Sequence, residues 1–157
     1  VPGKSAAIVI LNSVDMLNSL FIRSKCHISV AEISLFDRLG GRSAVRQLAS
    51  RFYDIMQREP GTQSILNMHP QDLKHSRKRL ENYLCEWLGG PELFGAAYMH
   101  ADWIKHRHQH LVIGLSERDQ WLHCMQLALH ELEVDKDVQF ELNKRFFQLA
   151  GYIRNQV

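Results

Sequence analysis

Apolar residues recur at helical spacing along most of the chain after residue 40. The first stripe runs from Val45 to Met56, and Pro60-Gly61 is expected to end that helix. A second stripe, from Leu73 to Leu88, predicts a helix that opens at Pro70, because proline suits the first helical position. Gly89-Gly90-Pro91 is expected to stop this helix.

The second half of the chain predicts further helices around one irregular connection. Residues 92–114 have little regular pattern, apart from a short helix expected over about 101–108. Ser116-Glu117-Arg118-Asp119 has the shape of a capping box that opens the next helix. The last helix is expected from about Val138, with one apolar face as far as Ile153. Since no stretch alternates like a strand, an all-α fold of four or five main helices is predicted.

The pattern of residues 1–31 differs from that of the rest of the chain. The longest charge-free stretch, Ser5 to Val14, is too short for a membrane-spanning helix, which needs about 20 apolar residues. Lys4 before it resembles the start of a signal peptide, but no small-x-small cleavage site follows. We therefore expect residues 1–31 to be a poorly ordered or partly helical extension, and residues 32–157 to form the domain.

Composition and charge narrow the class of protein. The chain has 157 residues, and 45% of them are apolar, which suits one domain with a tail. The formal net charge is +2, too small to imply a nucleic-acid or membrane partner by charge alone. Acidic residues flank the basic run 74–79, which favours a solvated face.

The cysteines argue against a disulfide scaffold. Cys26, Cys85 and Cys124 are an odd number with no paired spacing, which favours a reducing compartment and a cytoplasmic protein. A bond between Cys85 and Cys124 remains open at this point, although both fit small buried apolar positions.

Nine histidines are the unusual feature of the composition, and four of them lie in the irregular connection, at His100, His106, His108 and His110. Exposed polar residues are the plainest interpretation of each one taken alone. A zinc site is disfavoured, because the His106–His110 pair has no glutamate between its members and no cysteine pair stands nearby. A haem iron needs only one proximal imidazole, so a haem site is the remaining alternative.

Two aromatic residues could face such an iron. Tyr53 lies within the apolar stripe of the first long helix, and Trp121 lies near the apolar face of the helix after the capping box. Either residue could equally be core packing whose phenol or indole N–H finds a backbone partner. The spacing alone leaves both interpretations open.

A series of short motifs stands in order along the chain. They are Gly40-Gly41, Ser50-Arg51-Phe52-Tyr53, His69-Pro70-Gln71-Asp72-Leu73, Trp87-Leu88-Gly89-Gly90-Pro91, Arg107-His108, Ile113-Gly114 and Glu117-Arg118-Asp119-Gln120-Trp121-Leu122. With this order and these gaps, the motifs resemble those of the truncated haemoglobins, and the proximal motifs resemble the second group of that family. The resemblance covers about residues 33–155 and implies a two-over-two helical sandwich around haem b.

The resemblance implies roles for four residues around the iron. His108 matches the proximal ligand of the iron, and Tyr53 matches the distal tyrosine whose hydroxyl faces a bound diatomic molecule. Trp121 matches the tryptophan that marks the second group, with its indole N–H in the distal pocket. His69 stands where the family usually has tyrosine or phenylalanine, and it would add a third polar distal group.

Five further residues match positions that contact the haem. Ser76 falls where ordinary globins place a distal histidine, and Leu80 and Tyr83 follow on the same helix face as pocket walls. Arg79 and Arg107 are placed to pair with the haem propionates.

The family pattern is broken on either side of the proximal ligand. Residues 100–104 and 109–111 depart from it, which keeps His106 and His110 as competitors for the iron.

The resemblance implies a haem protein that binds O2, NO and CO at a pentacoordinate iron. Donors from Tyr53, Trp121 and His69 would stabilise negative charge on bound O2. The alternative is a haem enzyme of NO dioxygenation or peroxidase type, which would use peroxide or NO at the same site and draw electrons from a separate reductase. A haem-free helical interaction domain is the third possibility, and an absorption spectrum separates it from the other two.

Overall fold

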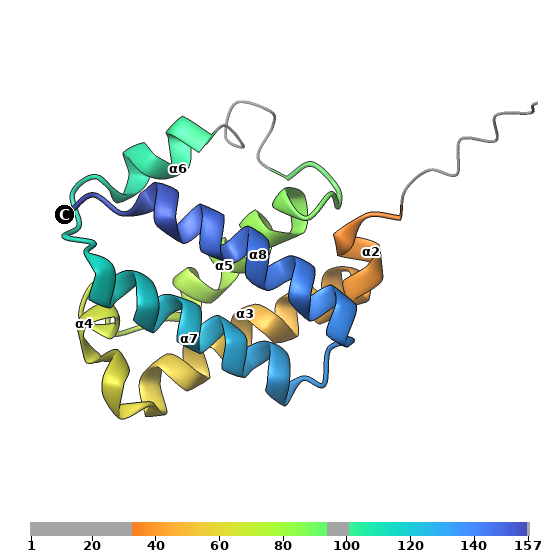
Figure 1. The fold of residues 1–157 in the computed structure, drawn as a ribbon, viewed down its shortest axis with the longest axis horizontal. Coiled ribbons are helices and arrows are strands. Elements are labelled where there is room, and N and C mark those ends of the chain that lie inside the picture. Colours follow the sequence, from red (N-terminus) through yellow and green to blue (C-terminus); the bar gives the residue numbers. More distant parts are fainter. Residues whose placement is uncertain (1–32, 94–100, 157) are drawn as a thin grey trace, which may run out of the picture. The chain divides into compact units, whose positions relative to one another are not determined.

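The computed structural model describes residues 33–93 and 101–156 (Figure 1). Within these residues every regular secondary-structure element is a helix. The predicted extension 1–31, with Cys26, and His100 lie outside the described residues. The elements in chain order are α2 (Leu35–Leu39), α3 (Gly41–Arg58), the 3-10 turn η1 (Pro60–Thr62), α4 (Gln63–Leu66), α5 (Lys74–Trp87), α6 (Ala101–His108), α7 (Leu115–Glu131) and α8 (Lys136–Ile153). The all-α prediction is confirmed.

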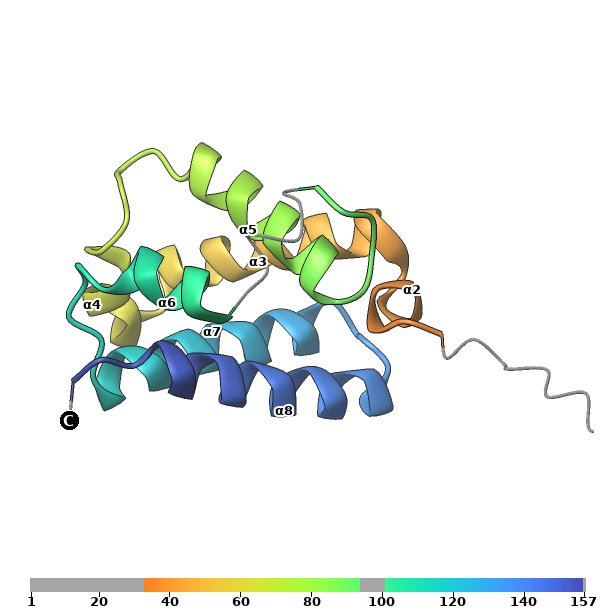
Figure 2. The same cartoon turned by 90° about the horizontal axis from the view of Figure 1, so that it is seen from above.

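Four long helices form two layers. Helix α3 packs against α5 in one layer and against α7 in the other, and α7 packs along α8. Figure 2 shows the α3–α5 pair above the α7–α8 pair, with the short helix α6 beside the end of α8. The expected two-over-two helical sandwich is therefore the arrangement of this domain.

The core lies between the two layers and is formed by the predicted apolar stripes. Phe52 of α3, Leu84 of α5, Met125 of α7 and Phe146 of α8 are all fully buried. Burial of each such side chain contributes about 1.5–3 kcal/mol, so the periodicity of the sequence accounts for the packing of the long helices.

Two helices start at other residues than predicted, and a carboxylate accepts a backbone N–H beside each start. Helix α5 begins at Lys74 rather than Pro70, and the Lys74 N–H donates to the Asp72 carboxylate at 2.9 Å. Helix α7 begins at Leu115, and the Gly114 N–H donates to the Glu117 carboxylate at 2.9 Å. The predicted box at residues 116–119 is therefore wrong in register, since the chain is already helical there.

The turn after α5 depends on glycine, as its sequence suggested. Gly89 has a φ of +93°, and a Cβ at Gly90 would lie 2.6 Å from both the Cys85 carbonyl oxygen and the Phe36 ring. The Phe36 N–H donates to the Leu88 carbonyl at 3.0 Å, which ties α2 to the end of α5. This close approach needs a residue without a side chain.

Cys85 and Cys124 are both buried free thiols, so the bond between them that the sequence left open is not formed. Burial raises the pKa of the Cys124 thiol to about 11, which leaves it protonated and unreactive at neutral pH. Within the described residues, no helix combines the length and the apolar content that a membrane crossing requires.

Candidate functional site

A cavity of about 540 Å³ lies between α3, α5, α6 and the segment after α4. Cavities of 300–1,000 Å³ are typical of cofactor and small-molecule sites. Eight of the nine residues singled out from the sequence line it, all except Trp121. The complete lining is Tyr53, His69, Ser76, Arg79, Leu80, Tyr83, Trp103, Ile104, Arg107, His108 and Leu111.

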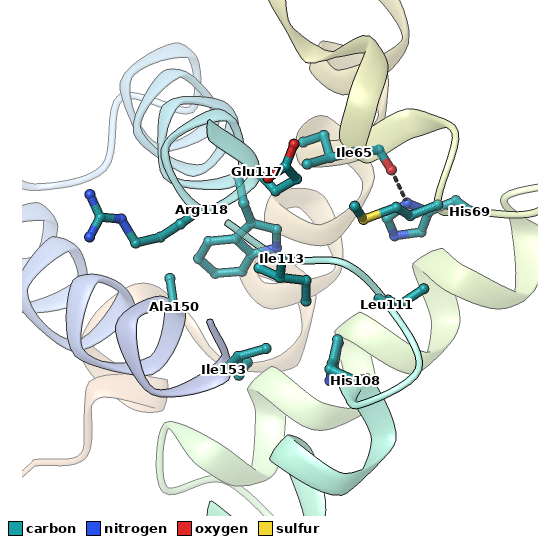
Figure 3. Close-up of a pocket in the computed structure, with 11 residues that line it drawn as sticks. Ile65, His69, His108, Leu111, Ile113, Glu117, Arg118, Ala150 and Ile153 are labelled. Carbon is teal, nitrogen blue, oxygen red and sulfur yellow. Dashed lines mark hydrogen bonds between the residues drawn. The ribbon is translucent and has the colours of Figure 1, made fainter. Parts of the chain in front are cut away.

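A smaller cavity of about 110 Å³ adjoins the first, and Trp121 lines it. His69, His108 and Leu111 border both cavities. Figure 3 shows His69 after α4, His108 at the end of α6, and Ile153 at the end of α8 around this smaller space. The structure therefore brings all nine predicted residues to one connected region.

His108 is the last residue of α6, and its ring is half-buried. Its Nδ1 lies 2.7 Å from the Ile104 carbonyl oxygen. Because a carbonyl only accepts, Nδ1 carries the proton and Nε2 keeps its lone pair in the neutral ring. Burial lowers the pKa of His108, against the opposite effect of the Ile104 carbonyl. A metal-binding histidine usually has this arrangement, with one nitrogen fixed by a backbone carbonyl and the other free.

The two other described histidines of this segment lie elsewhere. His106 and His110 are exposed, and neither lines the two cavities. The structure thus separates His108 from both of the competitors that the sequence had left open.

Tyr53 is buried in the middle of α3, with 5% of its surface exposed. Burial raises the pKa of its phenol to about 12, although the Ser76 hydroxyl and the Arg77 charge act in the opposite direction. The hydroxyl therefore stays protonated at physiological pH and remains able to donate a hydrogen bond into the larger cavity.

The ring of His69 meets the ring of Tyr53 edge-on, with centroids 5.3 Å apart and planes at 80°. Its Nδ1 lies 2.8 Å from the Ile65 carbonyl oxygen, the contact drawn as a dashed line in Figure 3. Burial lowers the pKa of His69, with the Ile65 carbonyl acting against it. His69 and His108 therefore hold the same tautomer by the same local contact.

Trp121 combines the two alternatives that the sequence left open. The centroid of its ring lies 5.6 Å from that of Phe52 and 5.5 Å from that of Phe146, so Trp121 is part of the core. It also borders the smaller cavity. No hydrogen bond joins its indole N–H to any residue of the described ranges, and no buried polar atom there lacks a partner, so the N–H is at least partly accessible.

The larger cavity has both apolar walls and positive charge. Leu80 and Tyr83 form the apolar wall on α5, and burial raises the pKa of Tyr83 to about 12. Arg107 lies over the Trp103 ring at 5.9 Å from its centroid. Within the described ranges no carboxylate pairs with Arg79 or Arg107, so both guanidinium groups remain available to an anionic ligand.

Two positioning residues were missed in the sequence. Glu117, which caps α7, also accepts a hydrogen bond from the Ser64 hydroxyl at 3.1 Å and so fixes α4, the helix that carries Ile65. The Asn155 side chain donates to the carbonyl of Leu111 at 2.8 Å and to that of His108 at 3.3 Å. An isolated asparagine near a chain end has no pattern that would have indicated this contact.

The family model for the bacterial-like globins matches residues 34–155. This chain belongs to the bacterial-like globins. The globin is similar to the group 2 truncated hemoglobin YjbI of Bacillus subtilis, with 27% identity over 116 residues, which is 74% of this chain and 85% of that protein.

Two solved structures have higher identity to this globin. The cold-adapted truncated hemoglobin of Pseudoalteromonas haloplanktis TAC125 is 37% identical, with a TM-score of 0.72 over 79% of this chain and 99% of that one. The group II 2-on-2 hemoglobin of Agrobacterium tumefaciens is 31% identical, with a TM-score of 0.74 over 83% of this chain and all of that one. The resemblance to group II truncated haemoglobins is confirmed.

Membership of this family implies that the globin holds haem and binds diatomic gases such as O2. The cavity fits such a cofactor on its own chemistry. It offers an imidazole nitrogen with a free lone pair at His108, an apolar wall, and two guanidinium groups, at Arg79 and Arg107, with which no described carboxylate pairs.

Proposed function

We propose that this globin holds haem b through His108 and binds O2, NO or CO at a five-coordinate iron. The observation that carries this proposal is the hydrogen bond from His108 Nδ1 to the Ile104 carbonyl, which leaves Nε2 as the nitrogen available to a metal. Haem iron, when bound, supplies the coordination site for the diatomic molecule.

The haem is oriented in this proposal by charge and by apolar contact. Arg79 and Arg107 would pair with the carboxylate groups of the cofactor, and Leu80 and Tyr83 would form apolar contacts with it. Charge-assisted hydrogen bonds between guanidinium and carboxylate are stronger than neutral ones, so the two arginines select one orientation of the cofactor.

Tyr53 and Trp121 are the proposed distal donors. The Tyr53 hydroxyl stays protonated because burial raises its pKa to about 12, and no described residue takes the Trp121 N–H. A ligand that gains negative charge is stabilised by such donors, by about 1.5–3 kcal/mol each in a water-poor cavity. Slow release of O2 is the consequence.

A second candidate is turnover of peroxide or NO at the same site, with electrons from a separate reductase. It is favoured by the tautomer of His69, which supplies a proton acceptor at the cavity wall.

The experiment that tests the proposal is an absorption spectrum of the protein purified after haem supplementation. A Soret band in the wild type and its loss in His108→Ala are expected, while His106→Ala and His110→Ala keep the band. A wild-type protein without a Soret band would exclude haem binding. An unchanged haem content in His108→Ala would move the ligand to another histidine.

A further inference from the structure

The basic run 74–79 divides between two places in the structure. Arg79 lines the larger cavity, whereas other members of the run face a separate groove between α3 and α5, which lie side by side in one layer (Figure 2). The groove measures about 340 Å³. Among the described residues, its lining has no member in common with either of the two cavities. The complete lining is Arg46, Ser50, Lys74, His75, Arg77, Lys78 and Glu81.

Positive charge dominates this groove. Four of the seven lining residues are arginine or lysine, and Glu81 is the one carboxylate among them. Glu81 already has partners, because it is buried and its carboxylate lies 3.0 Å from Lys78 and 3.6 Å from Arg46. The Lys74 ammonium is exposed, and no described carboxylate pairs with it. The groove therefore keeps positive charge that an anion could neutralise.

The size and the walls of the groove favour a small anion. Sites for small molecules typically have volumes of about 300–1,000 Å³. Arg46 and Ser50 of α3 face Lys74 and Lys78 of α5 across the groove, so a compact anion with several oxygens can accept hydrogen bonds from both helices. The phosphate groups of a small polyphosphate have this chemistry. The net charge of +2 on the chain gives less support to the long backbone of a nucleic acid.

Arg77 connects the groove to the proposed distal pocket. Its Nη1 donates to the Ser50 carbonyl at 2.5 Å and lies 2.9 Å from the Asp54 carboxylate, so its guanidinium is held against α3. The guanidinium carbon lies 5.7 Å from the centroid of the Tyr53 ring. Burial dominates and raises the pKa of Tyr53 to about 12, whereas the Ser76 hydroxyl and the Arg77 charge act to lower it. The charge of Arg77 thus makes the Tyr53 hydroxyl a stronger donor.

We propose that the groove between α3 and α5 binds a small polyphosphate anion, and that Arg77 transmits this binding to Tyr53. The bound anion offsets part of the positive charge beside the Tyr53 ring. The Tyr53 hydroxyl then becomes a weaker donor, and O2 is released faster. Binding in the groove is independent of the haem site, whereas the effect on O2 rests on the proposed function, in which Tyr53 is a distal donor.

The first experiment is titration calorimetry of the haem-loaded protein with pyrophosphate at physiological ionic strength. We expect one saturable site. Lys74→Gln removes an exposed cation without disturbing the core, and it should weaken binding about tenfold, the usual effect of one hydrogen bond to a charged group. Lys144→Gln removes an exposed lysine of α8 and makes the same change in net charge, so it is the matched control and keeps the wild-type affinity.

The second experiment measures displacement of O2 by CO with and without saturating pyrophosphate. We expect O2 release to become about fivefold faster, at the lower end of the usual coupling between two sites. Tyr53→Phe keeps the aromatic ring beside Arg77, so it should bind pyrophosphate like the wild type while its O2 release no longer responds. Because coupling is reciprocal, the oxygenated protein should bind pyrophosphate about fivefold more weakly than the deoxygenated protein.

Several results would overturn the inference. No saturable uptake by the wild type, or equal affinities in Lys74→Gln and Lys144→Gln, would remove the site. Stronger binding of a DNA oligonucleotide that displaces pyrophosphate would assign the groove to a nucleic-acid backbone instead. Uptake that leaves O2 release unchanged, or an equal response in Tyr53→Phe, would remove the role of Arg77. The Soret band of each sample shows its haem content, so a failure of haem binding is distinguished from a failure of the groove.

Discussion

Asn155 and Ile113 are joined by two hydrogen bonds: the Ile113 N–H donates to the Asn155 side-chain oxygen, and the Asn155 N–H donates to the Ile113 carbonyl, each at 3.0 Å. The same side chain donates to the Leu111 carbonyl at 2.8 Å. The segment between α6 and α7 is thus fastened to the end of α8. Because this segment directly follows His108, whose carbonyl also accepts from the Asn155 side chain, the contact helps to hold the proposed iron ligand in place.

Asn155→Ala is expected to loosen that segment. Loss of several hydrogen bonds at a partly exposed site lowers the free energy of unfolding by about 1–2 kcal/mol and speeds haem loss. Urea unfolding and the rate of haem transfer to an apoglobin acceptor measure the two effects. Gln156→Ala is the neighbouring control, since among the described residues its side chain bonds to Asn155 alone. Equal haem loss from both variants would leave Asn155 without a role in holding the loop.

Tyr53→Phe is expected to release O2 about 10- to 100-fold faster, because one hydrogen bond to a charged partner contributes about 1.5–3 kcal/mol. Flash photolysis or stopped-flow displacement of O2 by CO measures the rate. With a pKa of about 12, the Tyr53 phenol stays protonated up to that pH, so the wild-type rate should be flat from neutral to moderately alkaline pH. Tyr152→Phe, at an exposed tyrosine, is the matched control. Unchanged O2 release in Tyr53→Phe would leave Tyr53 as packing only.

Trp121→Phe keeps the aromatic packing of the side chain but removes its indole N–H. The phenyl ring still meets Phe52 and Phe146, so the free energy of unfolding should fall by only about 1 kcal/mol. Loss of the indole N–H should raise the O2 dissociation rate, which is measured beside chemical unfolding. A lower free energy of unfolding with an unchanged rate of O2 release would show that Trp121 has a packing role only.

The long helices could be predicted from the sequence because their apolar residues repeat with the helical period, and these residues are the ones buried in the core. The stripe from Val45 to Met56 is the buried face of α3. His108 was selected as the candidate ligand from a family resemblance that spans the whole domain. The start of α7 was predicted wrongly, since Ser116 suits a cap position by its type, whereas in the structure the Glu117 carboxylate accepts the N–H of Gly114. The tautomer of His69 was equally hidden, because it depends on the Ile65 carbonyl at the end of a one-turn helix.

Glu81 connects the stability of the domain to pH. Glu81 is buried, with 4% of the residue exposed, and its carboxylate lies 3.2 Å from the Arg42 guanidinium and 3.0 Å from the Lys78 ammonium. Burial acts to raise the pKa of Glu81, but Lys78 and the two nearby arginines outweigh it and lower the pKa overall. A carboxyl whose pKa is lower in the folded state stabilises the fold above its unfolded value, near 4.3, and this stabilisation is lost as the pH falls through the folded value.

Glu81→Gln is therefore expected to lower the free energy of unfolding by about 1–3 kcal/mol at pH 7, since it leaves three cations without their shared partner. The difference from the wild type should shrink as the pH falls below 4, where the native carboxyl also becomes protonated. Urea unfolding at several pH values measures it. Glu131→Gln, which removes a carboxylate paired with Arg51 and Arg58 at the surface, should cost less than about 1 kcal/mol. A deficit in Glu81→Gln that is the same at pH 7 and pH 3 would assign the effect to packing rather than to charge.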